Sequence, residues 1–424
     1  MTGPLLPTAG VPGAAAGRGP APTSRTRLAT WLLVAAIVAV ALNQRPAVVA
    51  VAPLLGDLRA DTGLSSAMAG LLTTVPVLCF GAFAPVAPRL ARRVGLETAV
   101  GASLLLLALG IALRLLSPVA LLYAGSLLAG AAIALANVLL PAYVKREFVR
   151  PGAVMGIYSA SLNVGAAAGA ALTLPVAGAL GLGWRGGLGL WLFLALGALV
   201  LWLPVAGTGR ARRVRGDAPP GGSWELLRLP LARRVCAFLA MQSLQFYAIA
   251  AWLPTLLADA GVPRSAGGLL LGLSNVVGAA GALVAPAQAG RMRGQRPLVV
   301  AVVGAYAVGL SGLLLLPDTA TVVWVCAWGV AQGSGFALAL TLIVLRSPTP
   351  FVAARLGGVA QCLGYLLAAS GPLVLGALHD ATRGWSWPLV VLLVAVVPMA
   401  WAGWGAARDA VLPVPARPEP VSRG

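Results

Sequence analysis

Long apolar runs, separated by short segments rich in charge, glycine or proline, extend along most of the chain. An apolar run of about 20 residues is long enough to cross a bilayer as a helix. The pattern predicts an all-α polytopic membrane protein with twelve transmembrane helices, at residues 28–53, 65–87, 98–116, 118–142, 153–179, 186–206, 233–257, 265–287, 297–316, 321–345, 355–378 and 386–406.

Composition supports this assignment. Hydrophobic residues make up 59% of the 424 positions and charged residues only 10%, whereas a soluble domain carries about a quarter charged residues. A formal net charge of +19 would suggest nucleic acid in a soluble protein. Because nearly all of these charges fall between the apolar runs, we expect a lipid bilayer as the partner and no nucleic acid.

The distribution of basic residues predicts the orientation. If both termini are cytoplasmic, 24 of the 30 Lys and Arg residues lie on the cytoplasmic side and five on the other, leaving only Arg45 inside a span. Short cytoplasmic loops carry such an excess. We therefore expect a multi-pass protein of the cell (inner) membrane with both termini cytoplasmic.

Composition also divides the chain into segments. The basic stretch before residue 233 contains the helix-breaking run 218–222 and separates six spans from six. We predict a disordered cytoplasmic tail at 1–27, a six-helix bundle at 28–206, a cytoplasmic linker at 207–232, a second six-helix bundle at 233–406 and a cytoplasmic tail at 407–424.

A faint internal repeat relates the two halves. The Ala-Pro pair 87–88 is echoed at 285–286, and Lys145 after span four corresponds to Arg346 after span ten. Two six-helix units repeated in one orientation are typical of major facilitator transporters, which bind substrate between the halves near the middle of the bilayer. The many glycines, including Gly165, Gly169, Gly278 and Gly281, fit either sliding surfaces or static packing.

Four segments carry a more specific resemblance: NQRP at 43–46, LLTTVPVLCFGAFAPVAPRLARRVGLE at 71–97, NVLLP at 137–141 and QCLGY at 361–365. Together they resemble the cyanate and 2-nitroimidazole transporter branch of the major facilitator superfamily, over essentially every span. Arg92 stands where the wider superfamily usually has an aspartate, and the RxxQG-like arginine of span four is absent. A coupling mechanism is therefore not carried over from proton-driven relatives.

Arg45 is the one ionisable residue predicted deep inside a span, because all eleven acidic residues fall in loops or tails. A buried guanidinium needs neutralisation, and with no carboxylate near it in sequence the natural counter-ion is an anionic substrate. Its planar fork of donors suits a small delocalised anion. Pro46 should kink the helix and open backbone groups to a cavity. The alternative is that Arg45 snorkels to the extracellular interface.

Polar residues at mid-depth in other spans could complete a cavity, although each could equally form an interhelical hydrogen bond. Together with Arg45, the candidate substrate-binding residues are Asn43, Thr74, Asn163, Gln242, Gln245, Asn275, Gln332, Gln361 and Tyr365. Tyr247 and Trp252 could form an apolar wall or simply pack in the core.

No catalytic or metal site is expected. The four cysteines lie in apolar runs without paired spacing, and the chain has a single histidine, which disfavours metal sites. No nucleophile beside a base and no phosphate loop is present, so we predict no enzyme and no cofactor. His379 and Asp380, at the end of span eleven, are outside candidates for proton coupling.

Two functions remain open. The first is a monomeric secondary transporter that moves a small organic or pseudohalide anion, cyanate-like or nitroimidazole-like, by alternating access with Arg45 recognising the charge. The second is an exporter of neutral or lipophilic compounds in which Arg45 is structural.

Overall fold

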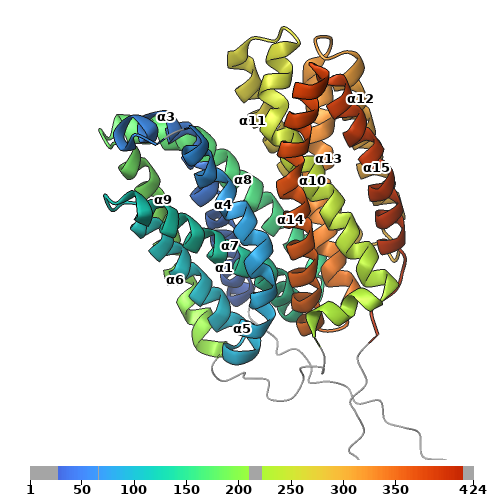
Figure 1. The fold of residues 1–424 in the computed structure, drawn as a ribbon. Helices are drawn as coiled ribbons and strands as arrows, with labels where there is room; N and C mark the ends of the chain where they lie inside the picture. Colours follow the sequence, from blue (N-terminus) through green and yellow to red (C-terminus); the bar gives the residue numbers. More distant parts are fainter. Residues whose placement is uncertain (1–26, 65, 210–221, 414–424) are drawn as a thin grey trace, which may run out of the picture.

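The computed structural model describes residues 27–64, 66–209 and 222–413, and within these residues every regular element is a helix (Figure 1). The predicted tail residues before 27 and after 413, and linker residues 210–221, lie outside the described residues. Twelve helical segments are long and apolar enough to cross a membrane. This confirms the predicted twelve-span, all-α architecture.

The first half contains spans one to six. Its elements are α1 (Arg27–Gln44), α2 (Pro46–Val49), α3 (Val51–Thr62), α4 (Ser66–Phe83), η1 (Ala84–Val86), α5 (Ala87–Val94), α6 (Leu96–Leu113), α7 (Val119–Glu147), α8 (Pro151–Ala179) and α9 (Trp184–Gly209).

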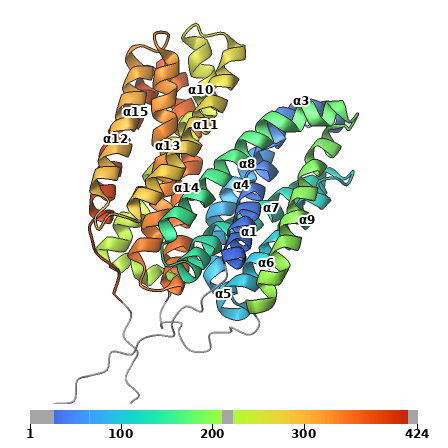
Figure 2. The ribbon, with the colours of Figure 1, turned by 180° about the vertical axis from the view of Figure 1, so that it is seen from behind.

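The second half contains spans seven to twelve and forms a separate bundle beside the first (Figures 1 and 2). Its elements are η2 (Ser223–Arg228), α10 (Pro230–Asp259), α11 (Arg264–Ala289), α12 (Arg296–Leu315), α13 (Thr321–Arg346), α14 (Pro350–Thr382) and α15 (Ser386–Ala406).

The internal repeat of the sequence corresponds to a polar contact that occurs at the same place in both halves. In the first half, Arg146 at the end of α7 pairs with Glu97 in the first turn of α6. In the second half, Arg346 at the end of α13 donates to the side-chain oxygen of Gln295, just before α12. The counterpart of Arg346 is therefore Arg146 and not Lys145, because successive helical residues point about 100° apart and only Arg146 faces α6.

The two halves touch mainly at one end. We call this the closed end: it is the end of the bundle at which α1 begins and α15 ends, and the halves diverge away from it (Figure 1). We call the other end, where the helices of the two halves lie apart, the open end (Figure 1).

Glycines make the contact at the closed end. A Cβ atom at Gly156 of α8 would lie 2.6 Å from the carbonyl oxygen of Leu283 on α11, and one at Gly358 of α14 would lie 2.9 Å from that of Ala84 in η1. Only residues without side chains permit this backbone approach. Arg92 adds a cation–π contact across the same end, with its Cζ atom 5.9 Å from the ring centroid of Phe351.

The four glycines singled out in the sequence pack within their own halves. Gly165 and Gly169 of α8 lie against the break between α1 and α2, at Leu42 and Pro46. Gly278 and Gly281 of α11 lie against α13, at Gln332 and Ser334. They therefore serve packing inside each bundle, and other glycines form the contact between the halves.

We expect Gly156→Ala to weaken the closed end, because the added methyl group meets backbone on α11 that cannot move aside. Overpacking of this kind costs about 1–3 kcal/mol, enough to shift a two-state population several-fold. Double electron–electron resonance between labels at Arg89 and Arg293, both exposed near this end, should report a new, longer distance. Gly304→Ala, where a Cβ meets nothing within 4 Å, is the control. An unchanged distance distribution in Gly156→Ala would contradict this account.

We also expect Glu97→Gln to lower the melting temperature, because the Glu97 side chain is 3% exposed and its loss leaves Arg146 paired with Glu147 alone. Breaking a buried pair costs about 3 kcal/mol. Asp61→Asn is the matched control. Asp61 is exposed at the opposite end, where donors from Arg185 and Trp184 hold its pKa below the usual value. An exposed pair contributes little, so equal shifts in the two variants would disprove the assignment.

Candidate functional site

The first span is interrupted at the residue singled out in the sequence. Helix α1 ends at Gln44, Arg45 follows, and α2 begins at Pro46, which cannot donate a backbone hydrogen bond to the Leu42 carbonyl. That carbonyl lies against Gly165 of α8, where a Cβ would be only 2.5 Å away. The freed group is therefore covered by α8 and does not open to a cavity as expected, because glycine allows α8 to approach.

The Arg45 side chain points from the first half toward the second. Its Nη1 atom donates to the Tyr247 hydroxyl on α10 across 3.5 Å, and its Cζ atom lies 5.5 Å from the ring centroid of Phe336 on α13. Both partners belong to the opposite bundle, so the guanidinium lies between the halves. All three side chains are only partly buried.

Aromatic rings surround this position. Tyr365 of α14 packs edge-on against Tyr247, with ring centroids 6.2 Å apart, and against Phe80 of α4 at 5.3 Å. The Tyr365 hydroxyl is buried and has no hydrogen-bond partner among the described residues. We call Phe80, Tyr247, Phe336 and Tyr365 the aromatic cluster. It presents ring faces and phenolic groups beside one cation.

No carboxylate compensates this cation within the described part of the chain. The ion pairs found there involve the carboxylates of Glu97, Glu147, Asp61, Asp259 and Asp380, none of them with Arg45. A guanidinium removed from water without a counter-ion is unfavourable by several kcal/mol. The positive charge of Arg45 is therefore not neutralised by an ion pair in that part of the chain.

A polar bridge lies on the closed-end side of the aromatic cluster. The Tyr158 hydroxyl donates to Asn137 Oδ1 at 3.1 Å, and Gln361 Nε2 donates to the Asn137 carbonyl oxygen, also at 3.1 Å. Gln361 lies one helical turn from Tyr365 on α14. The bridge joins α7 of the first half to α14 of the second and closes the space beneath Arg45.

Three of the ten residues predicted from sequence thus gather at this point: Arg45, Tyr365 and Gln361. Four others bond or pack inside their own half. Their contacts are Asn43 Nδ2 to the Leu194 carbonyl at 3.1 Å, Gln242 Nε2 to the Gln332 carbonyl at 3.2 Å, Gln245 Nε2 to the Leu392 carbonyl at 2.7 Å, and Gln332 beside Gly278.

The remaining three lie on other helices. Asn163 on α8 and Asn275 on α11 are partly exposed, and each donates to the carbonyl one turn earlier, at 3.1 and 3.0 Å. Thr74 is exposed on α4. Substrate contact by these three residues stays a prediction.

The sequence reasoning missed Tyr158, Phe80 and Phe336, and treated Tyr247 mainly as core. Aromatic residues inside apolar spans give no periodic signal that separates a cavity wall from packing. The sequence offered one indirect signal. Tyr247 and Phe336 lie on spans seven and ten, which the internal repeat makes the counterparts of spans one and four. Span one carries Arg45, which faces the same space.

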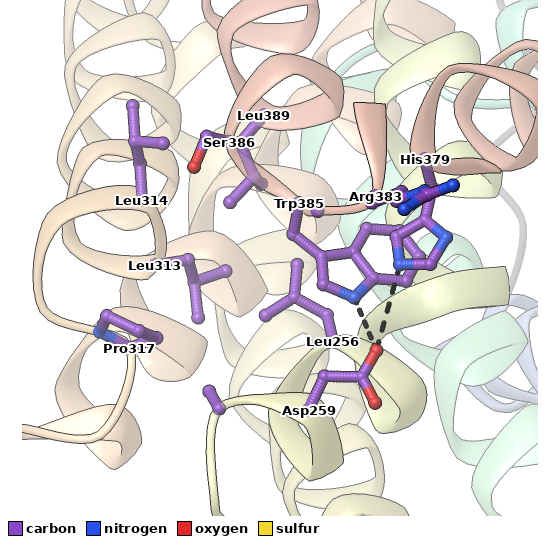
Figure 3. Close-up of a pocket in the computed structure, with 12 residues that line it drawn as sticks. Leu256, Asp259, Leu313, Leu314, Pro317, His379, Arg383, Trp385, Ser386 and Leu389 are labelled. Carbon is purple, nitrogen blue, oxygen red and sulfur yellow. Dashed lines mark hydrogen bonds and ion pairs between the residues drawn. The ribbon is translucent and has the colours of Figure 1, made fainter. Parts of the chain in front are cut away.

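A separate cavity lies inside the second half (Figure 3). It encloses about 350 Å³ between α10, α12, α14 and α15. On its wall, Asp259 accepts a hydrogen bond from Trp385 Nε1 at 2.8 Å and lies 3.8 Å from His379 Nε2. Because helices of one bundle line it, it is not the space between the halves. His379 and Asp380 are correspondingly remote from the aromatic cluster in the fold.

Comparison with known proteins agrees with this architecture. The chain is 38% identical to the 2-nitroimidazole transporter of Escherichia coli (strain K12), over 89% of this chain and 96% of the relative. It is 32% identical to the cyanate transport protein CynX of the same organism, over 81% and 89% respectively. The resemblance stated from sequence is therefore confirmed.

A solved structure shares the fold. The transporter FucP in the outward conformation superposes with a TM-score of 0.68 at 14% identity, covering 89% of this chain and 99% of that one. The model of the Major Facilitator Superfamily matches residues 32–372. From the twelve spans, the two bundles and these matches, the chain belongs to the major facilitator superfamily and is a transporter, not an enzyme.

Proposed function

We propose that this protein is a secondary transporter that moves a small organic or pseudohalide anion by alternating access, with Arg45 recognising the charge. The observation that carries the proposal is an uncompensated guanidinium between the halves, within an aromatic cluster. The relatives named for 2-nitroimidazole and cyanate support small, electron-delocalised solutes as the substrate class.

The chemistry of the position favours a planar anion. A guanidinium offers paired donors in one plane, which match a carboxylate or another delocalised anion. The faces of Tyr247 and Phe336 can cover a flat ring, while the unpaired hydroxyl of Tyr365 can donate to a second polar atom. An anion bound there would neutralise Arg45 and supply the hydrogen bonds that the protein itself does not.

We further propose that the closed end is cytoplasmic. The loops at that end carry the Lys and Arg excess that short cytoplasmic loops require, so the open end would face outward from the inner membrane. Substrate would then enter from outside and leave after the Gln361–Asn137 bridge breaks. The cytoplasmic termini, the limits of the two bundles, the linker and a monomeric state belong to the same proposal.

An alternative function is export of neutral or lipophilic compounds, in which the aromatic cluster selects apolar molecules and Arg45 is structural. The observation that favours it is the internal partnership of Arg45, whose guanidinium already contacts Tyr247 and Phe336.

We expect Arg45→Ala to abolish most uptake of labelled cyanate or 2-nitroimidazole into proteoliposomes. Hydrogen bonds to a charged group contribute about 1.5–3 kcal/mol, so we expect the apparent affinity of Arg45→Ala to fall about 10- to 100-fold. Arg45→Lys should be intermediate, because lysine keeps the charge but lacks the paired, coplanar donors of a guanidinium. Arg59→Ala, which removes an exposed positive charge near the open end, is the control. If both Arg45 variants transport these anions as well as the parent, the anion proposal fails. Retained export of neutral compounds would then favour the alternative.

We expect Tyr365→Phe to raise the melting temperature without substrate, because it removes a buried hydroxyl that has no partner. Leaving such a group unpaired costs about 1–3 kcal/mol. The same variant should bind the transported anion about tenfold more weakly, measured as a smaller ligand-induced thermal shift. Tyr158→Phe, which loses a hydrogen bond to Asn137, should instead lower the melting temperature. Unchanged anion affinity in Tyr365→Phe would remove its hydroxyl from the site.

A further inference from the structure

A second arginine, Arg114, is buried in the first half, at the end of the third span. Arg114 follows the last residue of α6 and is only 1% exposed. Its stem crosses α7 at Gly125, where a Cβ would lie 2.8 Å from Arg114 Cγ. The glycine leaves room for the guanidinium to reach beyond α7 toward the first span.

The guanidinium ends at the interrupted first span. Arg114 Nη1 donates to the carbonyl oxygen of Ala47, two residues after Arg45. Helix α2 ends at Val49 and α3 begins at Val51, with only Ala50 between them. The Ala47 carbonyl therefore lies at the junction of two short helices. Arg114 holds this junction from the side through one hydrogen bond.

Arg114 has no other polar partner among the described residues. Its Nε and Nη2 atoms are buried without hydrogen bonds, and it takes part in none of the ion pairs found there. A buried cation with one hydrogen bond and no counter-charge adds little to the free energy of unfolding. The one contact it makes is to the break in the first span.

The same short turn holds the backbone of Arg45. The Arg45 carbonyl oxygen accepts hydrogen bonds from Val48 and Val49, at 3.1 and 3.0 Å. Helix α2 spans only four residues. A hydrogen bond that fixes Ala47 therefore also fixes the direction in which the Arg45 side chain points. On the other side, Gly169 of α8 packs against Pro46. The turn is thus fixed between α8 and Arg114.

We propose that Arg114 is a positioning residue for transport: through its hydrogen bond to the Ala47 carbonyl it fixes the turn that aims Arg45 between the halves. This inference rests on the proposed role of Arg45 in anion recognition. It assigns Arg114 no contact with substrate, because its single polar contact is to the backbone of α2.

The first test compares Arg114→Met with Arg114→Lys in purified, full-length protein. Cyanate or 2-nitroimidazole binding is measured by thermal shift. Methionine keeps the volume but removes the donor, so Kd should rise at least tenfold, whereas lysine keeps one donor and should stay within threefold of the parent. Arg185→Met, which removes an arginine paired with exposed Asp61, should leave Kd unchanged. A methionine variant that binds like the parent, or a lysine variant as weak as methionine, would overturn the proposal.

The second test needs no anion and separates this inference from the proposed function. Arg45→Cys is introduced into a background whose four native cysteines are alanine, and its rate of labelling by a neutral methanethiosulfonate reagent is measured. Adding Arg114→Met should change that rate at least fivefold, while adding Arg114→Lys should not. Equal rates in all three proteins would overturn the positioning role, even if Arg45 recognises anions. If Arg114→Met does not fold, Arg114→Gln replaces it, because its amide is too short to reach Ala47.

Discussion

The bilayer interior offers no water to a backbone group that loses its partner, so an interrupted helix must be satisfied by the protein around it. This constraint organises the first span. Pro46 frees the Leu42 carbonyl, against which α8 packs at Gly165, and the Ala47 carbonyl accepts a hydrogen bond from Arg114. Because both sides of the short turn are held, Arg45 can leave the helix axis and reach the opposite bundle.

The two buried arginines of this region differ in what surrounds them. Arg45 meets phenol and ring faces on the second half and remains partly accessible, whereas Arg114 meets backbone and packed apolar side chains. Neither has a carboxylate partner among the described residues. The first half therefore concentrates positive charge near the break, while the second half contributes mainly aromatic surface. Under the proposed function, charge would be recognised by the first half and the shape of the solute mainly by the second.

The architecture could be predicted from sequence, and the site only in part. Apolar run length and the alternation of basic loops are properties of single segments, so twelve spans and two halves followed directly. Arg45 was identifiable because a charge inside a span is rare. The direction of Gln245 toward α15 and of Asn43 toward α9 depends on helix rotation, which a uniformly apolar span does not encode. Arg114 was not identified as a candidate, because it follows the last residue of α6 and the sequence does not show that its side chain turns back into the bundle.

The contact between the halves also has a consequence for motion. It consists mainly of glycine against backbone, with a few polar and aromatic contacts: hydrogen bonds from Gln361 to Asn137 and from Arg45 to Tyr247, cation–π contacts of Arg92 and Arg45, and the packing of Phe80 on Tyr365. No ion pair crosses it within the described residues. Separating the halves therefore exposes no desolvated charge pair in that part of the chain. The energy difference between their joined and parted states can therefore stay small enough for a single bound solute to tip.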